Sequence, residues 1–416
     1  MKLLLSTYFF LIFSLSLISF GSDWKNWLGP NYDGSLENFE IHLPKTGQNY
    51  SLVWSLNVGE GWSSPIIYNN FLYFHDRIGT KERIVCIDKT TGKEKWNFFY
   101  ESNYRDDFGM HNGPRSTPAI ADNTLVSHGP QGLVHALSVE SGRLLWKVDL
   151  KNRFNSSKGF FGRCSSPLIT NGSVIFDVGG SNVGLISLCI KSGKVLWTSQ
   201  KYGNDYSSCV PLRVENQRLC IAFVREGLLA LDERNGEKHF FAPLRSPIDA
   251  SVNAVSPLVH NNFIFVSSCY DVGAAVWRFE ENEKKSTFTF SEVWRSKGKL
   301  DCHYSTPVAR DGFVYGFHGR QERKPVLRCI NLTNAELIWE ADPFGVGHLV
   351  CIKDKIVVLS ERGELLIFKA SPDKTTLLHR QQILGFDTRA HFAFSNGCIY
   401  ARDKRRLVCF DLKKWD

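Results

Sequence analysis

Short apolar runs separated by polar turns recur along most of the chain. One unit begins with small residues that end in Ser/Thr-Pro, and a short apolar strand then leads into a polar turn such as Asn69-Asn70 or Asp311-Gly312. Asn, Asp and Gly tolerate positive φ, so these turns predict tight hairpins. A second apolar strand, a third such as residues 83–88, and a fourth strand that carries Trp complete the unit.

The unit recurs roughly every 40–54 residues, which is the range expected for propeller blades. Copies begin near residues 61, 113, 163, 205, 253, 302, 347 and 389. The last copy stops after its third strand, whereas an unmatched Trp strand at residues 52–56 precedes the first copy. We expect this strand to complete the last blade, because that closure pairs both edges of the ring. The sequence therefore predicts an all-β, eight-bladed β-propeller of four-stranded antiparallel blades over residues 50–416, closed by an N-terminal strand.

The first 21 residues have the pattern of a secretory signal peptide. Lys2 precedes an apolar run from Leu3 to Ile18, and Ser19-Phe20-Gly21 places small residues where cleavage after Gly21 requires them. An uncleaved membrane anchor is the alternative, but the apolar run is short for one. We expect export to the periplasm or the medium, with residues 22–49 as an N-terminal extension. The first cysteine is Cys86, so no lipid anchor is expected, and no later segment suggests a membrane span.

Composition changes this picture little. The formal net charge is +8, but basic clusters such as Lys404-Arg405-Arg406 lack interleaved aromatic residues, so no nucleic-acid partner is predicted. Eleven cysteines in an exported chain would ordinarily suggest disulfides. Several of them share one position in the repeat, which favours a role as small core residues. These are Cys86, Cys189, Cys329 and Cys409.

The repeat resembles that of the pyrroloquinoline-quinone-like (PQQ-like) family, whose units have a similar Thr-Gly-x-x-x-x-Trp ending. The clearest copies run from Thr91-Gly92 to Trp96 and from Ser141-Gly142 to Trp146. The segment from Trp24 to Gly34 is also similar to the opening of exported members. The resemblance covers almost all of residues 50–412 and implies the fold. It leaves activity open, since the superfamily includes dehydrogenases, assembly factors and sensors.

Propeller geometry assigns the loops to two faces. The short hairpin turns share one face, whereas the fourth-to-first and second-to-third loops share the other and include the long segments 98–114 and 151–162. Binding residues commonly lie on loops of a rigid scaffold. A ring of arginine, histidine and aromatic residues at this face predicts an axial funnel for an anionic or polar planar ligand. Alternatively, these polar groups satisfy one another. The candidate residues are Arg115, Arg163, Asp249, Asn253, His303, Arg320 and Glu361.

Two functions compete for this funnel. The leading hypothesis is a non-catalytic binding or scaffold protein, expected to be a monomer, whose partner is a protein, a glycan or a small polar ligand. The alternative, implied by the resemblance, is a PQQ-dependent quinoprotein oxidoreductase of alcohol or sugar dehydrogenase type, with calcium and a carboxylate base. Such dehydrogenases are typically longer and many have adjacent cysteines against the quinone, which this chain lacks. Isolated histidines predict no zinc site. An outer-membrane assembly role is a third possibility, because a lipoprotein of that machinery has the same repeat.

Overall fold

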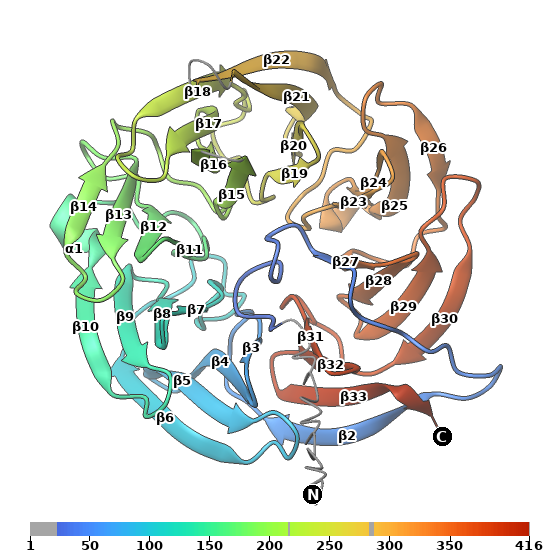
Figure 1. Ribbon diagram of the computed structural model, residues 1–416. Helices are drawn as coiled ribbons and strands as arrows, with labels where there is room; N and C mark the ends of the chain where they lie inside the picture. The colour runs from blue at the N-terminus through green and yellow to red at the C-terminus, as the bar shows by residue number, and fades with distance from the viewer. Residues whose placement is uncertain (1–22, 215–216, 283–286, 416) are drawn as a thin grey trace, which may run out of the picture.

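The computed structural model describes residues 23–214, 217–282 and 287–415, and eight β-sheets surround one axis in it (Figure 1). The signal peptide predicted at residues 1–21 lies outside the described residues. The innermost strands are β3 (Ile66–Tyr68), β7 (Ala119–Ala121), β11 (Leu168–Thr170), β15 (Val210–Val214), β19 (Leu258–His260), β23 (Val308–Arg310), β27 (Gly347–Ile352) and β31 (Ala393–Ser395). The second strands are β4 (Phe71–Ile78), β8 (Thr124–His128), β12 (Ser173–Asp177), β16 (Gln217–Val224), β20 (Phe263–Ser268), β24 (Phe313–His318), β28 (Lys355–Ser360) and β32 (Cys398–Arg402).

The outer half of each blade has the same regularity. The third strands are β5 (Lys81–Asp88), β9 (Leu133–Ser138), β13 (Leu185–Cys189), β17 (Gly227–Asp232), β21 (Gly273–Asn282), β25 (Val326–Asn331), β29 (Glu364–Lys369) and β33 (Arg406–Trp415). The outermost strands are β6 (Glu94–Glu101), β10 (Leu144–Asp149), β14 (Val195–Thr198), β18 (Lys238–Pro243), β22 (Thr287–Ser296), β26 (Leu337–Glu340), β30 (Leu377–Gln382) and β2 (Tyr50–Asn57). Blades are numbered 1 to 8 from β3. The predicted eight-bladed all-β propeller is confirmed.

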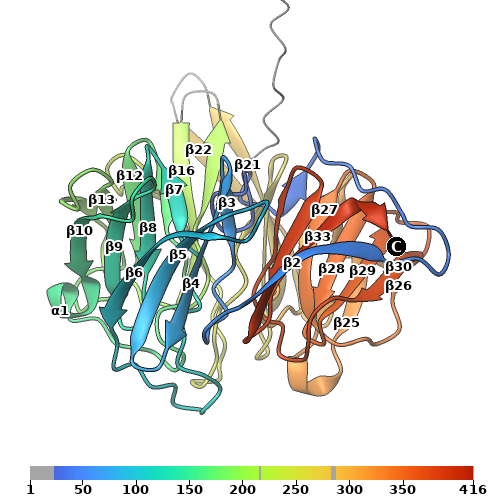
Figure 2. The ribbon, with the colours of Figure 1, turned by 90° about the horizontal axis from the view of Figure 1, so that it is seen from below.

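The last blade closes as the sequence predicts. Strand β2 pairs antiparallel with β33, with Leu52 opposite Phe410 and Ser55 opposite Val408 (Figure 2). The buried core is continuous across this junction, since Leu72 of blade 1 and Ile399 of blade 8 belong to one apolar cluster. Both ends of the repeat array are therefore paired. Among the described residues, the helices are too short and too polar to cross a bilayer.

The tryptophans of the outer strands join neighbouring blades. Trp96 Nε1 donates to the carbonyl of Val139 at 3.0 Å, and Trp146 Nε1 donates to that of Ile190 at 2.7 Å, in each case in the next blade. A Cβ on Gly142 would lie 2.5 Å from the Trp96 ring, so the turn needs glycine there. A register shift adjoins most of these tryptophans, which is how a β-bulge re-aims a side chain. Their regular spacing thus reflects blade packing.

Residues 23–36 occupy the centre of the ring on the side of the first-to-second turns (Figure 1). The amide of Ile67 donates to the carbonyl of Trp24 at 2.7 Å, and the amide of Cys351 donates to that of Gly34 at 2.8 Å. Strand β1 (Ser35–Leu36) then pairs parallel with β27. The segment thereby gives partners to inner-strand backbone groups that would otherwise face an open channel.

Candidate functional site

An axial cavity of about 420 Å³ opens on the face formed by the fourth-to-first and second-to-third loops, called here the funnel face. Inner strands begin at this face, so residues just before each of them surround the cavity. Most of the lining is apolar or aromatic. It consists of Trp27, Trp62, Phe108, Met110, Arg115, Phe160, Phe161, Cys164, Ser166, Tyr206, Ser208, Ala250, Val252, Ala254, Tyr270, His303, Tyr304, Arg320, Gln321, Glu322, His348 and Arg389.

The N-terminal segment supplies a wall of the cavity through Trp27. Its Nε1 donates to Ser256 Oγ at 3.0 Å, and its ring meets His348 and His391 edge-on at 6.0 and 5.4 Å between centroids. Burial lowers the pKa of His348 to about 3 and that of His391 to about 4. Both imidazoles are therefore neutral at physiological pH, and this end of the cavity carries no charge from them.

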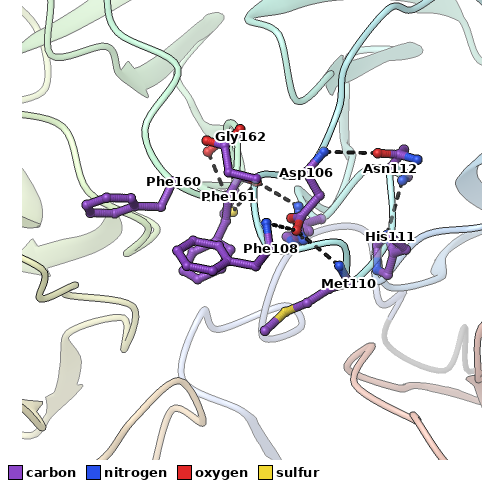
Figure 3. A network of polar contacts seen from close by, with 12 residues as sticks. Asp106, Phe108, Met110, His111, Asn112, Phe160, Phe161 and Gly162 are labelled. Atoms are coloured by element: carbon purple, nitrogen blue, oxygen red, sulfur yellow. Dashed lines mark hydrogen bonds and ion pairs between the residues drawn. The ribbon is translucent and has the colours of Figure 1, made fainter.

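Two loops meet at the cavity mouth, where hydrogen bonds surround Asp106 in one loop and Phe161 lies in the other (Figure 3). Asp106 Oδ1 accepts hydrogen bonds from the amides of Phe108 and Met110 at 2.9 and 3.1 Å. Its Oδ2 accepts from Arg115 Nη2 at 2.6 Å, and Arg115 Nη1 donates to the carbonyl of Phe161 at 2.7 Å. Burial alone would raise the pKa of Asp106, but the bonds from Met110 and Arg115 hold it below its usual range. We call this group of residues the clasp.

Three arginines line the cavity, and each has an acidic partner. Besides Arg115, Arg320 Nε lies 3.2 Å from Glu322 Oε2, and Arg389 Nε lies 3.2 Å from Asp387 Oδ1. Their planar faces cover aromatic rings: Arg320 Cζ is 4.8 Å from the Tyr270 centroid. The ion pairs compensate the positive charge, so the arginines present stacking surfaces more than net charge.

Several cavity-lining side chains have a buried polar atom without a hydrogen-bond partner among the described residues. They are Trp62 Nε1, the Tyr304 hydroxyl, His303 Nδ1, His348 Nδ1, Arg320 Nε and Arg389 Nε, the last two lying at ion-pair distance from a carboxylate but without a hydrogen bond. Leaving such groups unpaired costs about 1–3 kcal/mol each. Burial lowers the pKa of His303 to about 4, so its imidazole is neutral. Indole and phenol groups donate, which suits a ligand with acceptor atoms.

The cavity brings together Arg115, His303 and Arg320 from the residues predicted by sequence. Arg163 is buried and donates to the carbonyl of Val178 at 2.9 Å, and Asn253 Nδ2 donates to that of Val224 at 2.9 Å. These two side chains hold loops in place outside the lining. The remaining two candidates are also outside it. Asp249 is exposed beside Arg245, and Glu361 lies 4.0 Å from Arg389.

Aromatic residues around the funnel were expected from the sequence, and Trp62 and Tyr206 do line the cavity, but the apolar residues at its mouth and the contribution of Trp27 were not. Phe108, Met110 and Phe160 surround the mouth with exposed apolar surface, and Trp27 reaches the cavity from the far end of the ring. The one signal available was the unusual length of the two loops that carry Phe108 and Phe160. The repeat pattern did not indicate that residue 27 lies beside residues 348 and 391. That proximity depends on how the N-terminal segment, which is not part of the repeat, occupies the centre of the ring.

A calcium-bound quinone, which the PQQ-like resemblance implies, does not fit these residues. Calcium takes several oxygen ligands, with carboxylates prominent among them. The cavity lining contains one carboxylate, Glu322, which is ion-paired with Arg320. In the parts of the chain that the structure describes, no three His, Cys, Asp or Glu side chains converge as a metal site would require.

Eight four-stranded blades around an axial ligand-sized cavity define this protein as an eight-bladed β-propeller with a funnel site. A family model described as outer membrane protein assembly factor BamB matches residues 80–316, which is more than half of the chain. The chain belongs to this family of PQQ-like repeat propellers, as the repeat predicted.

Relatives and solved structures agree with this membership. The chain is 24% identical to outer membrane protein assembly factor BamB of Moranella endobia over 45% of each chain, so it spans about half of that relative's length. It is 21% identical to BamB of Yersinia pestis over 63% of this chain and 67% of that protein. The crystal structure of BamB from Moraxella catarrhalis superposes with a TM-score of 0.62 at 15% identity, covering 87% of this chain and 100% of that one.

A quinohemoprotein alcohol dehydrogenase from Comamonas testosteroni superposes with a TM-score of 0.68 at 12% identity, covering 94% of this chain and 80% of the dehydrogenase. Identities this low show a shared fold and leave the activity of this chain to its own site residues.

Proposed function

We propose that the protein is an exported, non-catalytic binding propeller that holds a ligand, or a segment of a protein partner, in the funnel cavity. The observation that carries the proposal is the combination of an apolar, aromatic cavity with unpaired buried donors at Trp62 and Tyr304. Ligand pockets typically pair an apolar lining with a few placed polar groups. The occupant would therefore have a flat apolar body and hydrogen-bond acceptors.

Kinship supports the idea of a protein partner. The relatives are named as factors in outer membrane protein assembly, and a scaffold role for this chain would use the same rigid ring. The exposed side chains of Phe108 and Phe160 at the mouth would give a partner segment apolar contacts next to the cavity. Export from residues 1–21 would place the protein where such partners occur.

The test uses 8-anilinonaphthalene-1-sulfonate as a fluorescent probe with an apolar aromatic body and an anionic group. We expect saturable binding with one site per chain, and weaker binding of neutral N-phenyl-1-naphthylamine, which lacks the sulfonate oxygens that the Trp62 and Tyr304 donors would bind. Ala254→Phe reduces the cavity and should weaken binding roughly tenfold, about 1.4 kcal/mol. Leu196→Phe on the exposed surface of β14 is the matched control and should bind normally.

Competition with PQQ, with and without calcium, distinguishes the alternatives. Calcium-dependent displacement of the probe followed by dye-linked alcohol oxidation would overturn the non-catalytic proposal. Binding that Ala254→Phe leaves unchanged would show that the probe sits elsewhere and would remove the funnel cavity from the proposal.

A further inference from the structure

Two cysteines meet in the closing blade, on the face opposite the funnel. Cys398 opens β32, and Cys409 lies in β33. In the antiparallel register Cys398 is opposite Asp411 and Tyr400 is opposite Cys409, so the cysteines are diagonal neighbours on one face of the sheet. The two side chains are close enough that each shifts the pKa of the other thiol.

The surroundings of Cys398 favour the thiolate. Its side chain is half-buried, whereas that of Cys409 is fully buried. Lys413 packs over the adjacent Gly397, and Lys89 Nζ donates to Ser395 Oγ at 3.0 Å, so two cations lie near the sulfur. Asp411 opposes them. Contact between the two cysteines holds the pKa of Cys398 below its usual range and raises the pKa of Cys409.

We propose that Cys398 and Cys409 form a redox-active dithiol that disulfide-bearing small molecules oxidise to an intramolecular disulfide. Cys398 is the attacking thiol and Cys409 the resolving thiol. The Cys398 thiolate attacks one sulfur of the external disulfide, whose S–S bond breaks and releases one thiolate. The Cys409 sulfur, losing its proton, then attacks Cys398 and expels the second. Two protein thiols are oxidised, and one external disulfide is reduced to two thiols.

The bridge would connect the two strands on which ring closure depends. Strand β33 carries β2 on its other edge, so a Cys398–Cys409 disulfide would fasten β32 to the strand that holds the N-terminal part of the chain. Oxidation would thereby set how readily the closing blade opens, through a site remote from the funnel cavity.

The chain contains its own matched controls. Cys209, just before β15, and Cys220, in β16, have the same diagonal offset, since Pro211 is opposite Cys220. Both are buried, and contact with Cys209 together with burial raises the pKa of Cys220 well above its usual range. Cys189 has a half-buried thiol whose pKa is lowered by its bond with Ser192, and it has no cysteine beside it in the register of β13. We expect Cys209 and Cys220 to stay reduced, and Cys189 to form a mixed disulfide with the reagent that no second cysteine resolves.

The test exposes the folded protein to oxidised glutathione, followed by alkylation, denaturation and mass spectrometry. Formation of the bridge should lower the number of free thiols from eleven by two. The oxidised protein should lose the mass of two hydrogens and yield a cross-linked peptide that contains Cys398 and Cys409. In Cys409→Ser a glutathione adduct should accumulate at Cys398. In Cys398→Ser neither product should form there, whereas Cys220→Ser should behave like the unaltered protein. Cys398 should react roughly tenfold or more faster than Cys220, since each pKa unit changes the thiolate fraction tenfold.

Two results would overturn the proposal. One is retention of both thiols while Cys189 becomes glutathionylated, which shows active reagent and an inert pair. The other is an adduct on Cys398 that persists when Cys409 is present, which shows that Cys409 does not resolve it. The oxidised protein should also have a higher Tm than the reduced protein, a difference that Cys398→Ser abolishes.

Discussion

Arg115 joins two loops that are about fifty residues apart in sequence, because its guanidinium binds Asp106 Oδ2 at 2.6 Å on one side and the Phe161 carbonyl at 2.7 Å on the other. Both members of the ion pair are almost fully buried. The two loops carry the apolar residues of the cavity mouth. The shape of that mouth therefore depends on a charge pair and not on the apolar contacts alone.

Loss of the Arg115 charge should loosen the clasp. Arg115→Met leaves the Asp106 carboxylate buried without its cation, and breaking such a pair costs about 3–5 kcal/mol. We expect faster hydrogen–deuterium exchange at the amides of Phe108 and Met110 and weaker probe binding, with the blades unchanged. Lys353→Met is the control, since its ion pair with Glu40 is exposed, lies away from both loops and is worth about 0–1 kcal/mol. Equal exchange in both variants would show that the loops hold their shape without Arg115.

Trp27 should be needed for binding more than for folding. Trp27→Ala removes the indole that borders the cavity and the bond to Ser256, while the outer-strand tryptophans still join the blades. Affinity for the anilinonaphthalene probe should fall roughly tenfold or more, because aromatic contact area is lost. Calorimetric titration measures the affinity, and urea unfolding measures the stability. Trp96→Ala should have the opposite effect: the free energy of unfolding should fall, whereas the folded fraction should bind the probe with unchanged affinity.

The fold was readable from sequence because its determinants are local and repeated. Pairs such as Asn171-Gly172 and Asn396-Gly397 adopt the positive φ values that the hairpins need. The outer-strand tryptophans also donate to a backbone carbonyl of the next blade, so the assignment of one blade helps to predict the others. Blade closure followed from counting strands, since one edge lacked its partner at each end of the array.

The site was only partly readable, since its geometry depends on contacts between distant segments. The position of Arg115 before an inner strand indicated the funnel face, and it does line the cavity. Arg163 lies one position earlier in the next blade, where Cys164 takes the place of Arg115 three residues before the proline, and its side chain turns to Val178 and Ser156. Cys164 lines the cavity as Arg115 does, so a shift of one position before the inner strand separates a lining side chain from a buried one that holds a loop.

Arg402 should stabilise ring closure. Its side chain is fully buried in blade 8, and it donates to the carbonyls of Gly59 at 2.7 Å and His75 at 3.3 Å, on the blade 1 side of the junction. Arg402→Met removes both bonds, at an expected cost of about 2–4 kcal/mol for charged donors to buried acceptors. The urea midpoint should fall accordingly. Arg278→Met, which breaks an exposed pair with Glu280, should change it little. Matching midpoints in the two variants would show that closure rests on β2 pairing alone.

A buried acid lies between blades 3 and 4. Asp177 ends β12 and accepts a bond from the Asp205 amide at 3.0 Å through Oδ2, whereas its Oδ1 has no partner among the described residues. Burial raises the pKa of Asp177 from 3.8 to about 8 and that of Asp205 to about 7. The folded protein therefore binds protons here that the unfolded chain releases near pH 4.

Stability should fall as pH rises through this window. Between about pH 4 and pH 8 the folded state holds more protons than the unfolded state, so the free energy of unfolding decreases with pH and levels off above pH 8. Asp177→Asn keeps an acceptor for the Asp205 amide and removes the ionisation. Its Tm should exceed that of the unaltered protein at pH 9, by about 2 °C for each kcal/mol recovered, with a smaller difference at pH 5. Asp271→Asn, at an exposed carboxylate paired with Lys297, is the control and should leave the pH profile unchanged. A parallel Tm profile for Asp177→Asn across this range would show that Asp177 ionises in the folded protein much as it does in the unfolded chain.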